Sequence, residues 1–135
     1  MEKLVRIKVP ATTANIGPGF DCLGMALDIW NYVEFTVTDG QKDEVLITGQ
    51  GQEVLDTGSE NLIVVSAHKY FSYFEIKPPK LLIKCENNIP VSRGLGSSSS
   101  AIIAGLLGAA SICEHSIDYD LLLKLAMKLK VMQIM

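Results

Sequence analysis

The sequence lacks the features that mark several common protein classes. Cys22, Cys85 and Cys113 are its only cysteines, and none lies at metal-site spacing from another. Basic residues are not in excess, since 12 lysines and arginines stand against 15 acidic residues. The most apolar run, residues 101–113, is shorter than the roughly 20 residues of a membrane span. These absences argue against nucleic acid and membrane as partners, and three unpaired thiols are typical of a reducing cytoplasm.

No secretion signal is recognisable either, because Met1 leads directly into a strand pattern. The chain has 135 residues, of which 48% are hydrophobic, and it contains no internal repeat and no long linker. We therefore expect one domain, or part of one, with enough apolar material for a core. A cytoplasmic location follows from these expectations.

One stretch is unusually rich in glycine and serine. It reads Pro90-Val91-Ser92-Arg93-Gly94-Leu95-Gly96-Ser97-Ser98-Ser99-Ser100, between an apolar strand pattern and an apolar helix pattern. Gly94 and Gly96 permit a positive φ and a close approach of the backbone to a ligand. The serines are favourable at a helix N-terminus, where free amide groups and the helix dipole attract an anion. The stretch predicts a phosphate site, although a serine-rich helix start without a ligand is the alternative.

The stretch does not match two widespread phosphate loops. A P-loop needs a lysine directly after its last glycine, and the dinucleotide motif needs a glycine where Ser99 stands. It does resemble the phosphate loop of the GHMP small-molecule kinases, which reads Pro, three variable residues and Gly-Leu-Gly-Ser-Ser. Every fixed position of that pattern is present. The resemblance implies that the backbone from Arg93 to Ser98 holds the triphosphate of ATP and that Ser98 binds Mg²⁺.

A second motif lies near the N-terminus, where residues 9–27 include Asn15-Ile16-Gly17-Pro18-Gly19-Phe20-Asp21. Such a loop could be an ordinary turn in which Asn15 and Asp21 bond their own backbone. It also resembles the first motif of the homoserine kinase branch of the GHMP family, with Thr13 and Ile16 as mild departures. The resemblance implies that Asn15 and Asp21 contact an amino-acid substrate. An amide and a carboxylate are suited to hold its ammonium and hydroxyl groups.

The remaining pattern predicts an α/β fold. Pro10 is expected to end the first strand, and Asp39-Gly40 to form a hairpin between the second and third strands. The expected strands cover residues 5–9, 32–37, 44–48 and 81–85, and the expected helices cover residues 62–74 and 101–113 and a segment capped by Ser116. The resemblance adds a topology, that of the GHMP kinase N-terminal domain, which is similar to the second domain of ribosomal protein S5.

Two other polar side chains call for interpretation. Asn61 precedes the helix expected over 62–74, where a cap is the simple reading. The resemblance implies that an asparagine at this helix start faces the nucleotide, so Asn61 is a candidate for the adenosine end. His68 lies within the same helix and has no ligand partner nearby in the sequence, so we interpret it as a surface or packing residue.

The C-terminal tail departs from the family pattern. The resemblance predicts Glu-Gly-His-x-Asp-Asn after residue 126, whereas residues 127–135 read Met-Lys-Leu-Lys-Val-Met-Gln-Ile-Met. One choice of codons for this tail, with a single C inserted after its first base, encodes Thr-Glu-Ile-Glu-Gly-His-Ala-Asp-Asn-Val. We therefore expect residues 1–126 to form the ATP-binding domain, residues 127–135 to be an aberrant tail after a one-base deletion, and the C-terminal GHMP domain to be absent.

The resemblance implies a function, ATP- and Mg²⁺-dependent phosphorylation of the side-chain hydroxyl of L-homoserine to O-phospho-L-homoserine in threonine biosynthesis. It also allows a homodimer for full-length members. The chain alone is expected to have little or no activity, and no residue is assigned as a general base. Two alternatives stay open: another GHMP kinase, acting for example on mevalonate or shikimate, and a non-catalytic nucleotide-binding fragment.

Overall fold

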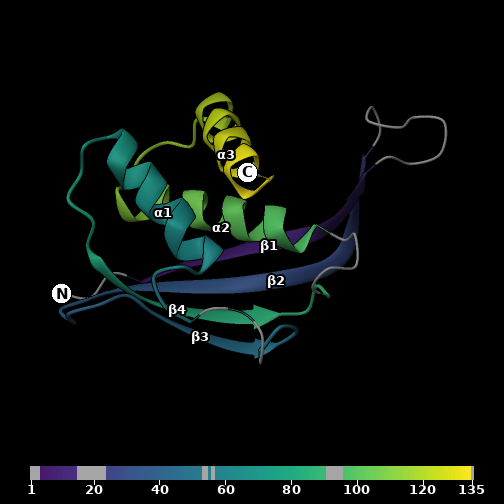
Figure 1. Cartoon of the computed structure of the whole chain (residues 1–135), viewed down its shortest axis with the longest axis horizontal. Coiled ribbons are helices and arrows are strands. Elements are labelled where there is room, and N and C mark those ends of the chain that lie inside the picture. Colours follow the sequence, from purple (N-terminus) through teal and green to yellow (C-terminus); the bar gives the residue numbers. More distant parts are fainter. Residues whose placement is uncertain (1–3, 15–23, 53–54, 56, 91–95, 135) are drawn as a thin grey trace.

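The structure is a four-stranded sheet with three helices on one side of it (Figure 1). A computed structural model describes residues 4–14, 24–52, 55, 57–90 and 96–134. The elements in chain order are β1 (Leu4–Ala14), β2 (Gly24–Thr38), β3 (Glu44–Gly49), α1 (Leu62–Tyr73), β4 (Lys80–Asn87), α2 (Ser97–Ile112) and α3 (Tyr119–Ile134). This is the order of strands and helices that the sequence predicted, so the α/β class is confirmed.

The strand order differs from the expectation. The sheet runs β1-β2-β4-β3, and β3 pairs in parallel with β4 rather than with β2. The prediction of a hairpin at Asp39-Gly40 is therefore wrong, because β4 lies between the two strands that this turn connects. Parallel neighbours need a long crossover connection, and here α1 supplies it between β3 and β4. A local turn pattern cannot reveal such a distant partner.

Pro10 does not end the first strand, which is a second correction. β1 continues to Ala14, and its pairing with β2 shifts register between Pro10 and Ala11. The physical reason is the position of β1 at the edge of the sheet, where a proline removes no hydrogen bond from a central ladder. As a result β1 and β2 form a long pair that extends past the two shorter strands (Figure 1).

The core lies between the sheet and the α1–α2 layer. Alternate side chains of the strands point into it, among them Phe35, Ile83 and Leu81, each at most 1% exposed. Gly108 of α2 packs directly on the ring of Phe35, where a Cβ atom would collide. α2 thereby approaches the centre of the sheet closely, which fixes the direction in which its N-terminus points.

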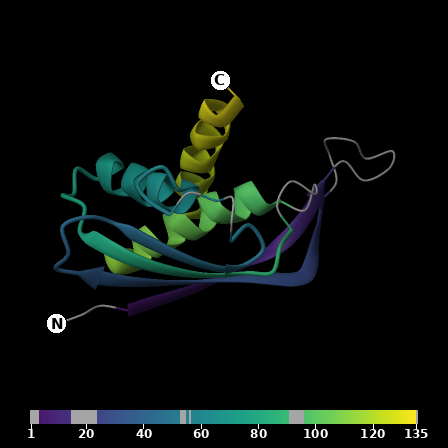
Figure 2. The same ribbon diagram turned by 60° about the horizontal axis from the view of Figure 1, so that its bottom comes forward.

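α3 packs on the outer side of the helical layer and stands away from the sheet (Figure 2). Leu122, Leu125 and Leu129 are its buried contacts, each at most 5% exposed. Asp118 caps its first turn by accepting a hydrogen bond from the Leu121 amide at 3.1 Å, so the cap is not Ser116 as predicted. The expected aberrant tail is helical here as far as Ile134.

None of the helices in the described part of the chain has the length and apolar character needed to cross a lipid bilayer.

Candidate functional site

A cavity of about 370 Å³ lies between the sheet and the N-terminal ends of α1 and α2. Its walls combine apolar side chains with a smaller group of polar ones, a combination typical of small-molecule sites. The apolar residues include Val9, Val33, Ile47, Ile63, Ile89 and Ala104, and the polar ones are Asn31, Glu60, Asn61, Asn87, Ser97, Ser98 and Ser100. Residues far apart in the sequence, from the predicted phosphate stretch and from the start of α1, thus share one cavity.

The start of α2 has the geometry of an anion site. Gly96 is its N-cap, with φ 77° in the left-handed region and no side-chain hydrogen bond capping the helix. The first helical bond of the turn runs from the Ser100 amide to the Gly96 carbonyl, at 2.8 Å. The amides of the three residues before Ser100 therefore have no acceptor within the helix, and the dipole adds a partial positive charge.

Glycine is required at position 96 for two independent reasons. A positive φ is unfavourable for any residue with a side chain, and a Cβ atom there would collide with Oγ1 of Thr12 on β1. The sequence-based prediction that this glycine takes a positive φ is confirmed. The contact with β1 holds the start of α2 against the sheet.

The four serines at the start of α2 differ in their contacts. Ser97, Ser98 and Ser100 line the cavity. Ser100 is only 5% exposed, and its hydroxyl donates to the carbonyl of Pro10 at 3.2 Å, which fastens the first turn to β1. Ser98 and Ser99 are half-buried. Ser100 thus has a structural contact, while Ser97 and Ser98 lie where a ligand could reach them.

Lys130 of α3 brings a positive charge to this end of α2. Its Nζ donates to Oγ of Ser98 at 3.0 Å. The ammonium group and the helix N-terminus both favour an anion at this position. Sequence reasoning missed Lys130, because it lies in a segment without a recognisable motif and 32 residues from its partner.

Asn61 occupies the capping position that its sequence context predicted. Its side-chain oxygen accepts a hydrogen bond from the Ile63 amide at 2.9 Å, and the residue is 7% exposed. It also lines the cavity shared with Ser98. The structure therefore places Asn61 beside the candidate site with its oxygen engaged in the cap.

Asn31 of β2 is a residue of the site that sequence reasoning missed. Its Oδ1 accepts two backbone hydrogen bonds, from Asn88 at 2.7 Å and from Ile89 at 2.9 Å. These bonds hold the segment that leads from β4 into Pro90. The sequence did contain a sign of this position. Asn31 lies two and four residues before Val33 and Phe35 on β2, so its side chain points to the same inward face, and the residue is 8% exposed.

The thiol of Cys85 also lines the cavity, and burial raises its pKa to about 12. A thiol with such a pKa is neutral near pH 7 and is a poor nucleophile or metal ligand. This agrees with the core role expected for Cys85; Cys22 lies outside the described residues.

The described residues form no cluster of three or more histidine, cysteine or acidic side chains that could hold a metal ion. Ser98 supplies one oxygen that could bind Mg²⁺, but the Lys130 ammonium now contacts that oxygen. His68 lies away from the cavity lining and pairs with the buried carboxylate of Asp43 at 2.7 Å, which also accepts from the Leu81 amide. This pair joins α1 to the sheet, in agreement with the packing role predicted for His68.

Several predicted site residues lie outside the described part of the chain. They are Asn15, Asp21, Val91, Ser92, Arg93, Gly94 and Leu95. Pro90 is described, is half-buried, and follows the anchored Ile89. The phosphate stretch is thus described at Pro90 and from Gly96 onward.

Comparison with known proteins gives consistent results. The chain is 42% identical over 130 residues to a homoserine kinase of Prochlorococcus marinus, covering 95% of this chain and 41% of that protein. The structure of homoserine kinase from Cytophaga hutchinsonii matches with a TM-score of 0.82 and 28% identity, covering 94% of this chain and 41% of that one. Mevalonate kinase of Methanococcus jannaschii shares the fold, with a TM-score of 0.75 and 17% identity over 95% of this chain and 46% of that one.

The chain spans about two fifths of the length of the curated relatives it matches. The family model described as the GHMP kinases N-terminal domain matches residues 61–133, which include Asn61, the serines of α2 and Lys130. This match covers more than half of the chain, and the chain therefore belongs to the GHMP kinase family, as part of its N-terminal domain.

Proposed function

We propose that this chain is the N-terminal, ATP-binding part of a homoserine kinase. The observation that carries the proposal is the uncapped start of α2 at Gly96, which faces the cavity that Asn61 also lines. Such a helix start binds phosphate through backbone amides. The names of the curated relatives support homoserine as the acceptor.

In the proposed reaction the chain acts mainly by positioning, as phosphoryl transfer requires. The amides of Ser97, Ser98 and Ser99 hold phosphate oxygens. With the tail that this chain carries, the Lys130 ammonium also offsets part of their negative charge. The bond from the γ-phosphorus to its bridging oxygen breaks, and a bond from that phosphorus to the homoserine hydroxyl oxygen forms. The hydroxyl proton leaves to solvent, and ADP keeps the bridging oxygen.

Asn61 and the apolar cavity wall are proposed to receive the adenosine end of ATP. Asn15 and Asp21 are proposed to bind the ammonium and hydroxyl groups of homoserine. Mg²⁺ would arrive with the phosphates and supply further charge neutralisation, since it prefers phosphate and water oxygens plus few protein ligands. Ser98 would hold the metal through its hydroxyl oxygen, the atom that the Lys130 ammonium contacts in this structure. We place this chemistry in the cytoplasm, where ATP is present and free thiols such as that of Cys85 persist.

Two measurements test the proposed function. Calorimetry with ATP is expected to show binding to the chain, and Gly96→Ala is expected to abolish it, because the Cβ collides with Thr12 and the φ becomes strained. Gly40→Ala is the matched control, since Gly40 has no positive φ and is exposed, and its added Cβ would approach nothing closer than the rotatable Thr38 Oγ1, at 3.3 Å. Equal ATP affinity in the Gly96 variant would remove the basis of the proposal.

ADP release should depend on the acceptor supplied. We propose that homoserine supports turnover better than mevalonate or shikimate, and that turnover by this chain is low. Faster turnover with mevalonate or shikimate than with homoserine would identify a different GHMP kinase. ATP binding without turnover on any acceptor would indicate a nucleotide-binding fragment.

We further propose that residues 1–126 form the ATP-binding domain and that residues 127–135 result from a one-base deletion. Leu129 is buried in α3, and the restored frame also places an apolar residue, isoleucine, at that position. The restored frame changes Lys130 to glutamate, which would give the Ser98 hydroxyl an acidic neighbour suited to Mg²⁺. Reading the nucleotide sequence of the gene decides the matter, and an intact frame without a downstream Glu-Gly-His motif would contradict the proposal.

A further inference from the structure

The ammonium group of Lys130 lies beside a second positive group, the N-terminal end of α2. Its Nζ donates to the Ser98 hydroxyl at 3.0 Å, in the first turn of that helix. A helix N-terminus carries a partial positive charge, so a lysine is electrostatically unfavourable there unless an anion lies nearby. In the described part of the chain no carboxylate forms an ion pair with Lys130. The two positive groups together therefore favour a ligand of high negative charge.

The packing of α3 keeps Lys130 at this place. Its neighbour Leu129 is 2% exposed, and Leu125, one turn earlier, is 1% exposed. Both leucines belong to the core that α3 shares with α1 and α2. Lys130 itself is exposed, so its side chain can turn, but the backbone that carries it is held beside α2. The positive charge therefore stays near the Ser98 hydroxyl even when the hydrogen bond opens.

The same contact disfavours a metal ion at Ser98. Mg²⁺ needs oxygen ligands and repels another cation. A metal ion at the Ser98 oxygen would compete with the ammonium for that one atom. Glu60 is the only acidic residue among the described residues that line the cavity, and it precedes α1 rather than α2. In this chain the surroundings of Ser98 thus suit a phosphate oxygen better than a metal ion.

We propose that this chain binds ATP preferentially as the metal-free anion, and that Mg²⁺ opposes binding through the charge of Lys130. The inference rests on the ATP site of the proposed function. Metal-free ATP brings its full negative charge to the amides of α2 and to the ammonium. A Mg²⁺ ion held by the phosphates lowers that charge and places two positive charges beside a third. At a separation of roughly 4 Å, and after screening by water and salt, this repulsion should lower the affinity on the order of tenfold.

Calorimetry on the full 135-residue chain tests the preference. ATP affinity is measured in excess EDTA and in excess Mg²⁺ at matched ionic strength, and the Kd should be about tenfold lower without the metal. Inorganic triphosphate should show the same preference, because the amides of α2 and the ammonium contact phosphate only. Equal or tighter binding with Mg²⁺ would overturn the inference and leave the proposed function standing. Absence of ATP binding in both conditions would overturn both.

The substitution Lys130→Gln tests whether this one charge causes the preference. Glutamine removes the charge and keeps a long side chain that can still donate to the Ser98 hydroxyl. Affinity for metal-free ATP should fall about 3- to 10-fold, and affinity in Mg²⁺ should not fall, because attraction and repulsion are removed together. The ratio of the two Kd values should therefore approach one.

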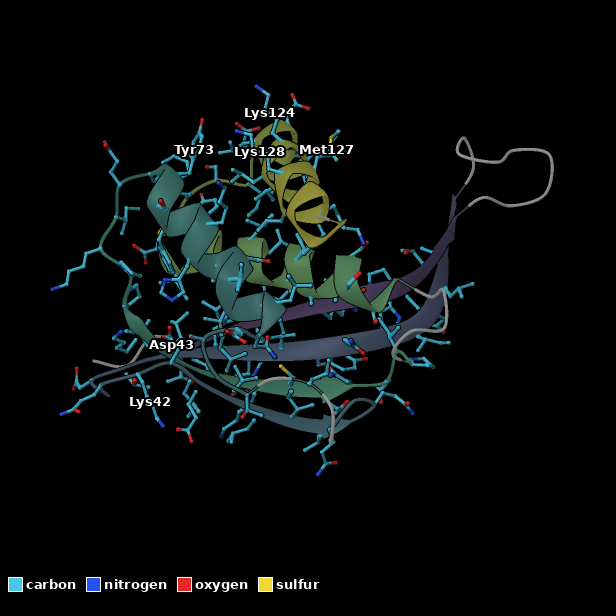
Figure 3. The ribbon with its side chains drawn as sticks, viewed as in Figure 1. Lys42, Asp43, Tyr73, Lys124, Met127 and Lys128 are labelled. Carbon is cyan, nitrogen blue, oxygen red and sulfur yellow. The ribbon has the colours of Figure 1, made fainter. Side chains whose placement is uncertain are left out.

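Lys128→Gln is the matched control. It removes the same charge from an exposed lysine two residues earlier, roughly 200° around the helix. Figure 3 shows Lys128 on the side of α3 that faces away from the sheet. This variant should keep the preference for metal-free ATP, and circular dichroism checks that both variants have the helix content of the unchanged chain. A preference that survives in Lys130→Gln, or that is lost equally in both variants, would overturn the inference.

Discussion

Replacing Asn31 by alanine should loosen the segment that enters the phosphate stretch. Its side-chain oxygen is the acceptor for two backbone amides, those of Asn88 at 2.7 Å and Ile89 at 2.9 Å. The Asn31→Ala variant leaves both amides without this acceptor. The Ile89 amide is buried, so water cannot easily replace the lost bond.

The expected cost follows from these two bonds. A buried donor left without an acceptor costs about 1–3 kcal/mol, and the partly buried Asn88 amide adds about 1 kcal/mol. The total, about 2–4 kcal/mol, is a large share of the roughly 5–15 kcal/mol that stabilises a typical domain. Urea unfolding measures it, and ATP affinity should fall as well because Pro90 loses its anchored neighbour.

Two control variants separate the hydrogen bonds from general disruption. Asn31→Asp keeps an oxygen that can accept both amides, so its stability should stay closer to that of the unchanged chain. Asn88→Ala removes an exposed side-chain bond to the Trp30 carbonyl, which should cost less than about 1 kcal/mol. If Asn31→Ala and Asn88→Ala are equally stable, Asn31 does not anchor the segment.

Three further predictions concern packing, protonation and charge. Gly108→Ala should lower the free energy of unfolding by about 1–3 kcal/mol, because its added Cβ collides with the ring of Phe35. The control variant Gly40→Ala should have little effect on the free energy of unfolding. Similar losses in the two variants would contradict the close packing of Gly108 on Phe35. Burial raises the pKa of Cys85 from 9.0 to about 12, so the folded chain keeps a proton that the unfolded chain loses. Its stabilising contribution is complete below pH 9.0 and is lost as the pH rises through about 12. Between pH 9.0 and about 12, the free energy of unfolding measured with urea should therefore fall more steeply with pH for the unchanged chain than for Cys85→Ala. Parallel declines in the two chains would refute this prediction. Lys130→Ala should weaken ATP binding about 3- to 10-fold at low salt and less at high salt, since the ammonium acts through its charge. Calorimetry at two salt concentrations measures this difference. A loss of ATP affinity that does not depend on salt would indicate that Lys130 acts through packing instead.

The sequence predicted the order of elements because periodicity and breakers act locally. α1 (Leu62–Tyr73) is an example, since its cap Asn61 and its apolar face are both visible in the sequence. The pairing of β3 with β4 was not visible, because it depends on α1 closing a crossover between distant strands. Likewise Pro10 is a strand breaker in isolation and is tolerated here only because β1 is an edge strand.

The candidate site was predictable where its chemistry lies in the backbone. Gly96 and the serines after it indicate a helix start that can bind an anion, and the structure shows the positive φ that this requires. Asn31 and Lys130 were missed for different reasons. An inward-facing asparagine in a strand was a readable signal, whereas the approach of Lys130 to Ser98 arises only from the packing of α3 on α2.

Backbone amide shifts during titration with ATP test the central claim most directly. In a ¹⁵N-labelled chain, the amides of Ser97, Ser98 and Ser99 should show the largest changes with ATP and with triphosphate, and little change with adenosine. This result is expected because the uncapped amides of α2 would bind phosphate oxygens. Equal changes with adenosine, or changes confined to other parts of the chain, would contradict the account.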